Sequence, residues 1–199
     1  KICGTSLKCL VVDDMLVDDF SMPKMPKLER MLINYGNVTS NLVSTNNKKI
    51  TQKNYLAKGI YPIFDQGNNY ISGFTNNKEK VIECNSPVLI FGDHTRVVKM
   101  VSEDFATGAD GVKVLQPKKY LNPKLLEYFT NYLAIAIKDK GYARHYQWIE
   151  KEQIGVPPME EQNRIVNKID NLFLEMDKGV KSLKKAKNQL ELFRESLLK

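Results

Sequence analysis

The sequence has 199 residues, enough for one ordinary domain with a long helix or for two small domains. Its net charge of +7 lies mainly in residues 27–159 and fits a polyanionic partner, although solubility alone explains it equally well. Its three cysteines have no metal-site or redox spacing, and no apolar run reaches the ~20 residues that cross a bilayer. We therefore expect a cytoplasmic protein with free thiols and without a metal, a cofactor or a membrane contact.

The N-terminal part of the chain gives few structural signals. Residues 1–28 combine an acidic run with two prolines, and we interpret them as an arm, or the tail of a preceding element, of unknown role. The loop at residues 46–54 is polar and basic. Its lysines, Lys48, Lys49 and Lys53, are able to neutralise phosphates without reading a sequence. A solvated loop without a partner is the alternative.

Short strand signals separated by Gly and Asn turns follow between residues 60 and 115. They predict an α+β fold with a mostly antiparallel, barrel-like sheet. Gln66, Asn68 and Asn69 at one turn are able to pair with adenine, but turn chemistry explains them fully. The expected strands span residues 60–65, 70–75, 80–84, 88–91, 97–101 and 111–115.

A polar tip, Asp93-His94-Thr95-Arg96, follows the continuously apolar strand at 88–91. Arg96 has the donors to grip guanine O6 and N7 together, while His94 and Thr95 are able to reach base edges or phosphates. Loops on rigid strands are where binding residues concentrate. The alternative is a solvated turn with a surface Asp–Arg pair.

A helix is expected at 123–138, because Asn122 is a capping residue and Pro123 suits the first helical position; Gly141 would close it. The loop that follows mixes cations with aromatic residues, which suits phosphate contact and stacking on nucleotides. Alternatively, its aromatic side chains pack on the sheet and its arginine is solvated. The candidate DNA-contacting residues of this loop are Tyr142, Arg144, His145 and Tyr146.

A long helix is expected after Pro157 and Pro158, which stop the preceding segment and are followed by two glutamates suited to a helix N-terminus. Its apolar residues keep a seven-residue repeat over nearly five heptads, typical of a coiled coil, and its lysines alternate with acids as on a solvated face. Gly179 can mark a bend. A lone helix would leave the apolar seam in water, so a partner helix is required. The residues expected to pair with that helix are Ile165, Ile169, Leu172, Met176, Leu183, Leu190, Phe193 and Leu197.

Several stretches of the sequence resemble one protein family. Residues 156–166, V-P-P-M-E-E-Q-N-R-I-V, resemble the P-P-L-x-E-Q-x-R-I-V signature of the specificity (S) subunits of type I restriction-modification enzymes, with Met159 in place of the usual leucine. Residues 59–74 resemble the family's G-x-Y-P-x-Y/F-G-x-N-G-x-x-G-Y/F block, with a different turn. Weaker matches follow in family order at 87–96, 108–117 and 121–128.

The resemblance implies a DNA target-recognition domain at 29–156 and a spacer helix at 157–199, while the arm at 1–28 matches no part of the family. One domain and one helix correspond to a half-size or truncated S subunit. In the family, such a subunit reads half of a bipartite site on double-stranded DNA, docks modification (methyltransferase) and restriction subunits, and does no chemistry itself. A homodimer through the C-terminal helix would read a palindromic pair of half-sites.

Two alternatives stay open from the sequence. The chain can be the recognition tail of a fused restriction-methylase polypeptide, with the catalytic domains before residue 1. It can also be a non-catalytic coiled-coil scaffold whose β-domain binds protein. Since the sequence has no phosphate-binding glycine motif, no complete methyltransferase motif and no nuclease acid pattern, catalysis by this chain is not expected.

Overall fold

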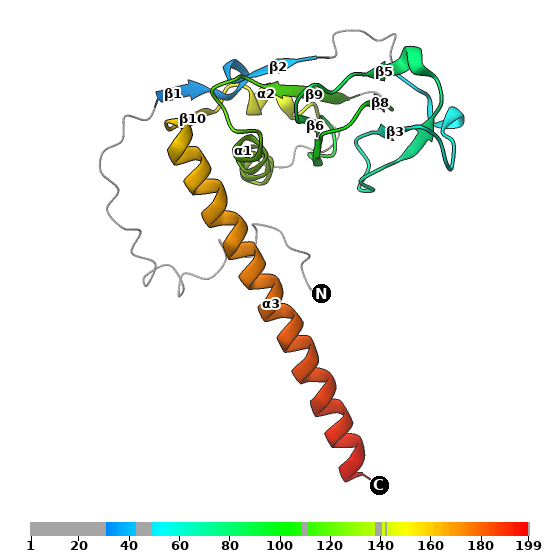
Figure 1. The fold of residues 1–199 in the computed structure, drawn as a ribbon, viewed down its shortest axis with the longest axis vertical. Helices are drawn as coiled ribbons and strands as arrows, with labels where there is room; N and C mark the ends of the chain where they lie inside the picture. The colour runs from blue at the N-terminus through cyan, green and yellow to red at the C-terminus, as the bar shows by residue number, and fades with distance from the viewer. Residues whose placement is uncertain (1–30, 43–48, 109–110, 138–140, 142, 199) are drawn as a thin grey trace. The chain divides into compact units, whose positions relative to one another are not determined.

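The computed structural model describes residues 31–42, 49–108, 111–137, 141 and 143–198 (Figure 1). The chain divides into two compact units, Lys1–Met159 and Glu160–Lys199, which we describe one at a time. The arm expected at residues 1–28 lies outside the described residues.

The described residues of the first unit form three sheets. The first four-stranded sheet has the order β2-β9-β6-β7, the second has the order β4-β3-β8-β5, and β1 pairs with β10. All pairs are antiparallel except the parallel pair of β3 and β8. The strands are β1 (Met31–Asn34), β2 (Thr39–Asn41), β3 (Tyr61–Phe64), β4 (Gly73–Thr75), β5 (Val81–Ile82), β6 (Val88–Gly92), β7 (Val98–Val101), β8 (Phe105–Thr107), β9 (Val112–Pro117) and β10 (Gln153–Val156).

The expected α+β, mostly antiparallel fold is confirmed, with one refinement. Among the described residues, neither four-stranded sheet closes on itself, so the domain is barrel-like only in a loose sense. All six expected strands are present with shifted ends, and the hairpin around Gly67 pairs Tyr61 with Thr75 and Ile63 with Gly73. β1, β2 and β8 were not expected.

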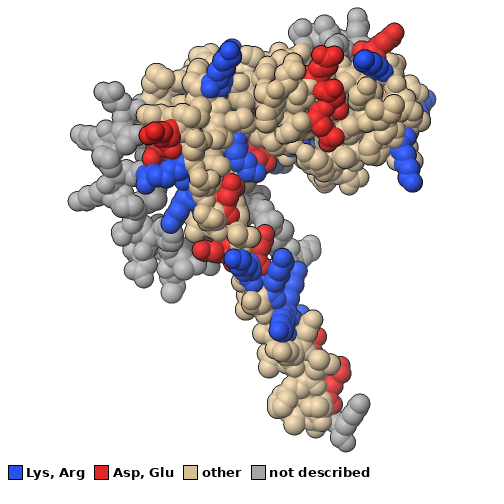
Figure 2. All heavy atoms as spheres, in the orientation of Figure 1, with Lys and Arg blue, Asp and Glu red and all other residues tan. Residues whose placement is uncertain are grey.

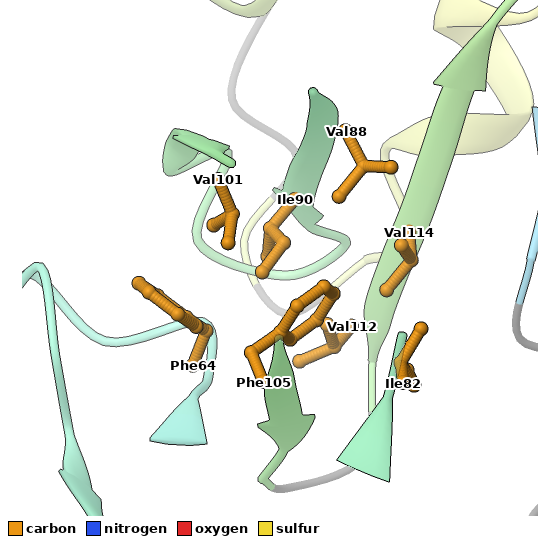
Figure 3. Packing of buried hydrophobic residues seen from close by; sticks show 8 residues of the cluster. All are labelled: Phe64, Ile82, Val88, Ile90, Val101, Phe105, Val112 and Val114. Atoms are coloured by element: carbon orange, nitrogen blue, oxygen red, sulfur yellow. The ribbon is translucent and has the colours of Figure 1, made fainter. Parts of the chain in front are cut away.

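The main core lies between the two four-stranded sheets. Figure 3 shows its side chains pointing toward one another from strands of both sheets. The rings of Phe64 on β3 and Phe105 on β8 meet edge to face, with centroids 5.6 Å apart. Every residue of β6 is buried, as its unbroken apolar sequence predicts. The buried members of the core are Phe64, Ile82, Val88, Ile90, Val101, Phe105, Val112 and Val114.

Helix α1 (Pro123–Ala136) packs against β6 and β7 and begins as expected. The side chain of Asn122 accepts hydrogen bonds from the backbone N–H groups of Lys124 and Leu125, which satisfies two donors of the first turn. The expected end was wrong. The helix stops at Ala136 because Ile137 takes an extended backbone conformation, well before Gly141. Two short helical segments, η2 (Tyr35–Asn37) and α2 (Tyr146–Ile149), complete the part of the unit near β10.

The second unit consists of helix α3 (Met159–Leu197), 39 residues that rise about 58 Å. It runs through Gly179 without a break in the helix. Lys and Arg side chains gather over its middle, with Asp and Glu on either side of them along the helix (Figure 2). Large apolar side chains of both heptad rows are exposed: Leu172, Met176, Leu183, Leu190, Phe193 and Leu197.

Candidate nucleic-acid interface

The loop that joins β3 to β4 is organised around the carboxylate of Asp65. Its Oδ1 accepts a hydrogen bond from the backbone N–H of Gly67 at 2.8 Å and a short one from the hydroxyl of Ser72. Its Oδ2 accepts a hydrogen bond from the hydroxyl of Tyr55 at 3.5 Å. The bond to Gly67 is an Asx turn, in which an Asp side chain accepts from the backbone two residues on. One side chain therefore holds a loop whose tip, at residues 67–70, is exposed.

A buried lysine fastens the same loop to β7. The Lys99 side chain is 3% exposed, and its Nζ donates hydrogen bonds to the backbone carbonyls of Asp65 at 2.8 Å and Asn69 at 2.6 Å. The same Nζ lies 3.8 Å from Oδ1 of Asp65. Burial lowers the pKa of Lys99, and the Asp65 carboxylate opposes that shift. Because a buried charge is tolerated only when it is paired and hydrogen-bonded, these contacts fix the loop against the sheet.

The tip between β6 and β7 contacts two other loops. The hydroxyl of Thr95 donates a hydrogen bond to the backbone carbonyl of Gln66 at 2.7 Å. Nδ1 of His94 lies 3.2 Å from the backbone carbonyl of Ala143. The tip therefore joins the β3–β4 loop on one side and the segment before α2 on the other.

Buried Asp93 anchors the segment before α2. The Asp93 residue is 2% exposed, and its Oδ1 accepts a hydrogen bond from the backbone N–H of Tyr146 at 2.8 Å. Its backbone carbonyl accepts from the N–H of His145 at 2.8 Å and lies 3.0 Å from Nδ1 of the same histidine. His145 is fully buried. In this conformation, His145 positions the segment from inside the domain.

Two glycines make room for these contacts. A side chain at Gly108 would place Cβ 1.7 Å from the hydroxyl of Tyr55. Gly111 has φ +83°, and a Cβ there would lie 2.8 Å from Cδ2 of His94. Gly108 therefore lies directly against Tyr55, and Gly111 lies directly against the polar tip.

We call the surface formed by residues 49–55, 65–72, 93–96 and 143–146 the loop surface. It contains a polar pocket of about 310 Å³. The short helical segment η4 (Gln52–Asn54) forms one part of its edge. The residues that line the pocket are Gln52, Tyr55, Asp65, Gly67, Asn68, Asn69 and Ser72.

Most of the predicted contact residues fall on this one surface. Lys53, Thr95 and Arg144 are exposed. Lys49, His94, Arg96 and Tyr146 are half-buried. Lys48 and Tyr142 lie outside the described residues.

Tyr146 packs its ring against the domain more than the loop sequence suggested. The ring lies 6.1 Å from that of Phe91, between centroids, and Nζ of Lys113 lies 5.6 Å from its centroid. Burial raises the pKa of Tyr146, and a side-chain hydrogen bond with Thr39 opposes that shift. A contact of Tyr146 with DNA stays a prediction.

Arg96 has a structural role that the sequence did not indicate. Its Nη1 donates hydrogen bonds to the backbone carbonyls of Ala134 at 3.3 Å and Ile137 at 3.0 Å, which are orphan acceptors at the end of α1. Its backbone has φ +61°, in the left-handed region. Arg96 thus joins the polar tip to α1 through Nη1, and a contact of Arg96 with guanine stays a prediction.

The residues that line the pocket carry only weak signals in the sequence. Asn68 and Asn69 were explained as turn residues, and Gln52 and Tyr55 gave no signal of their own. A stronger signal was available in β7, where Lys99 alternates in phase with buried Val101 and is therefore directed inward. An inward lysine requires a buried acceptor, and the Asp65 loop supplies one.

Two kinds of feature are absent from the described residues. No helix there combines the length and apolar character needed to cross a bilayer. No group of three or more His, Cys, Asp or Glu side chains in the described part of the chain is placed to hold a metal ion.

A family model described as the type I restriction modification DNA specificity domain matches residues 40–192. The chain belongs to this family. No curated protein matches the sequence of this specificity domain.

Three solved structures share the fold of this specificity domain. They are the HsdS subunit from Thermoanaerobacter tengcongensis (TM-score 0.57, 19% identity), a chain from a study of complex assembly and conformational transition of the type I R-M system (0.56, 21%), and the S subunit from M. genitalium (0.54, 16%). The matches cover 79%, 89% and 81% of the specificity-domain chain. The chain spans only 40%, 46% and 44% of the length of those solved chains.

Proposed function

We propose that this specificity domain reads one half of a bipartite site on double-stranded DNA, with the loop surface facing the DNA. One observation carries the proposal: four separate loop segments are linked to one another by hydrogen bonds, and buried Asp65–Lys99 and Asp93 contacts hold three of them against the domain. Reading bases requires donors and acceptors held in place by a rigid support. A solvated surface loop does not need such a support.

The exposed groups of the loop surface suit two kinds of DNA contact. Lys53 and Arg144 are exposed cations able to bind phosphates, and Lys48 and Lys49 extend the same basic loop. Thr95 is hydrogen-bonded to Gln66, within the same loop as the exposed amides of the pocket, and His94 precedes it, so base edges would be read on this side. Phosphate contacts would set the position of the domain, and the pocket side would supply sequence choice.

The chain would select the sequence and leave the chemistry to other subunits. We propose that α3 pairs with a second spacer helix, from a second copy or another half of the subunit. Modification subunits would dock on the helix pair and methylate adenine, and restriction subunits would join for cleavage. Such an assembly acts on DNA in the cytoplasm.

The first test is a map of methylated adenines across the genome in cells with the gene intact and with it deleted. Loss of one bipartite motif on deletion is the expected result, and a palindromic motif would indicate two identical domains. An unchanged map, together with no salt-dependent DNA binding by the complex with its modification subunits, would overturn the proposal and favour a scaffold.

A second test separates phosphate contacts from base contacts in the purified complex with modification subunits. Lys53→Ala and Arg144→Ala should weaken binding to all sequences and reduce the slope of log K against log salt by about one each. The matched control is Lys78→Ala, an equally exposed lysine on η5 (Lys78–Lys80), outside the loop surface. If all three variants gave the same slope of log K against log salt, the DNA would not bind at the loop surface.

A further inference from the structure

The pocket on the loop surface has an unusual charge for a DNA-facing site. Asp65 is the only charged side chain among the seven residues that line it. The other lining side chains are amides and hydroxyls. Asp65 holds its own loop, but a carboxylate also repels DNA phosphates, so a ligand group that it contacts should be a hydrogen-bond donor.

The two oxygens of this carboxylate are used unequally. Oδ1 accepts from Gly67 and Ser72 and is the oxygen nearest to the ammonium of Lys99. Among the described residues, the one hydrogen bond to Oδ2 is the long contact of 3.5 Å from Tyr55. A carboxylate has about four acceptor positions. Oδ2 therefore keeps acceptor capacity, and the Asp65 side chain is 17% exposed.

The carboxylate is also held in place without help from a ligand. The buried ammonium of Lys99 neutralises it, and Lys99 is itself fixed by two backbone carbonyls. The loop is thus complete before any partner arrives. An acceptor fixed in this way is suited to a ligand group that only donates hydrogen bonds.

In the major groove, such donors are the exocyclic amino groups of cytosine (N4) and adenine (N6). Guanine and thymine present acceptors at the corresponding positions. The amides of Gln52, Asn68 and Asn69 supply both donors and acceptors around the same pocket.

We infer that the pocket selects a base that carries an amino group, adenine or cytosine, with Oδ2 of Asp65 as the acceptor. This inference rests on the proposed function. It names one position of the half-site as A or C and excludes G and T there.

The test uses the wild-type complex with modification subunits and duplexes that contain the methylated motif. Each adenine of the half-site is replaced in turn by purine, and each cytosine by 2-pyrimidinone, which removes one amino group at a time. At one position, removing the amino group should lower the affinity of the wild-type complex for the duplex about tenfold. The same replacement should change the affinity of the Asp65→Asn complex little. If every replacement weakens both proteins equally, the inference is overturned.

The variant gives a second, independent readout. In Asp65→Asn, the amide oxygen can still accept from Gly67 and Ser72, while its NH₂ faces the pocket as a donor. The methylation motif should then change at one position toward G or T. Ser72→Ala, which weakens the support at Oδ1 and leaves Oδ2 intact, should lower methylation without changing the motif. A motif unchanged in Asp65→Asn would overturn the inference, whereas the absence of any wild-type motif would overturn the proposed function itself.

Discussion

The ammonium of Lys99 lies 3.8 Å from Oδ1 of Asp65, across 34 residues of sequence, and both side chains are largely buried. Each group is expensive to bury alone, and each offsets part of the cost of burying the other. The pair connects β7 to the β3–β4 loop, so a contact inside the domain determines how the loop surface is presented.

Replacing Lys99 with Met should lower the free energy of unfolding by about 2–4 kcal/mol. The aliphatic part of the side chain is kept, but the Asp65 carboxylate and two carbonyls lose their donor. Urea unfolding followed by circular dichroism measures the change. Lys78→Met, at an exposed position, should cost less than about 0.5 kcal/mol. Similar values for the two variants would show that the buried pair contributes nothing to stability.

Arg96→Ala should destabilise the domain by about 1–2 kcal/mol, because the carbonyls of Ala134 and Ile137 lose their donor. Arg96→Gly loses the same hydrogen bonds but relieves the φ of +61°, so it should be about 1 kcal/mol more stable than Arg96→Ala. Thermal unfolding of the two variants compares them.

The same variants separate a positioning role of Arg96 from base contact. If Arg96 only positions the tip, both variants lower methylation and keep the motif. A motif that changes at a guanine in both variants would instead support the predicted contact of Arg96 with that base.

The features predicted well from the sequence depend on near neighbours. Asn122 and Pro123 specify the start of α1 within one turn, and the unbroken apolar run of β6 identifies a central buried strand. The start of α3 follows from the prolines at 157 and 158. In each case, the physical cause lies within a few residues of its effect.

The features missed depend on distant partners. β8 has three residues, Phe105–Thr107, and is a strand only because it pairs with β3 and β5. The end of α1 was placed too late because Arg96, from another loop, supplies the hydrogen bonds there. The pocket was missed for the same reason, since Tyr55 and Asp65 meet only after the sheet has formed.

Stability should fall at alkaline pH partly through Tyr35. Burial raises the pKa of this fully buried tyrosine, and its hydrogen bond with Thr130, at 2.6 Å, opposes the shift. The folded state then holds a proton that the unfolded chain releases above about pH 10, so the Tyr35 contribution is complete below pH 10 and is lost as the pH rises further.

Tyr35→Phe tests this contribution. The variant should lose about 1 kcal/mol at pH 7, because Thr130 keeps its bond to the carbonyl of Leu126 and loses only the tyrosine partner. It should also show a shallower fall in unfolding free energy between pH 9 and about pH 11. If the unfolding free energies of the wild type and Tyr35→Phe fell in parallel with pH, Tyr35 would not be the cause of the alkaline loss of stability.

Gly108→Ala should destabilise the domain by about 1–3 kcal/mol, because the new Cβ would lie 1.7 Å from the hydroxyl of Tyr55 and 3.0 Å from Cβ of Asp65. Removing the ring should relieve the first clash. We therefore expect Tyr55→Ala and Gly108→Ala together to cost at least 1 kcal/mol less than the sum of the two single changes, measured by urea unfolding. Additive costs would show that Tyr55 moves away freely.

The exposed seam of α3 predicts self-association of the chain. Leu183 and Leu190 are 72% and 68% exposed and lie in the same heptad row, so lysines there would place charge in a helix pair. Sedimentation should show a concentration-dependent dimer for the wild type and a monomer for the variant with both leucines changed to Lys.

The matched control for this experiment is Leu174→Lys. Leu174 is a 53% exposed leucine of the same helix but lies outside both heptad rows, so its replacement should leave the dimer intact. If Leu174→Lys dissociated the dimer as strongly, general loss of apolar surface would explain the effect. If the wild type stayed monomeric at every concentration, the seam would require a different helix as its partner, and co-expression with modification subunits would be the way to find it.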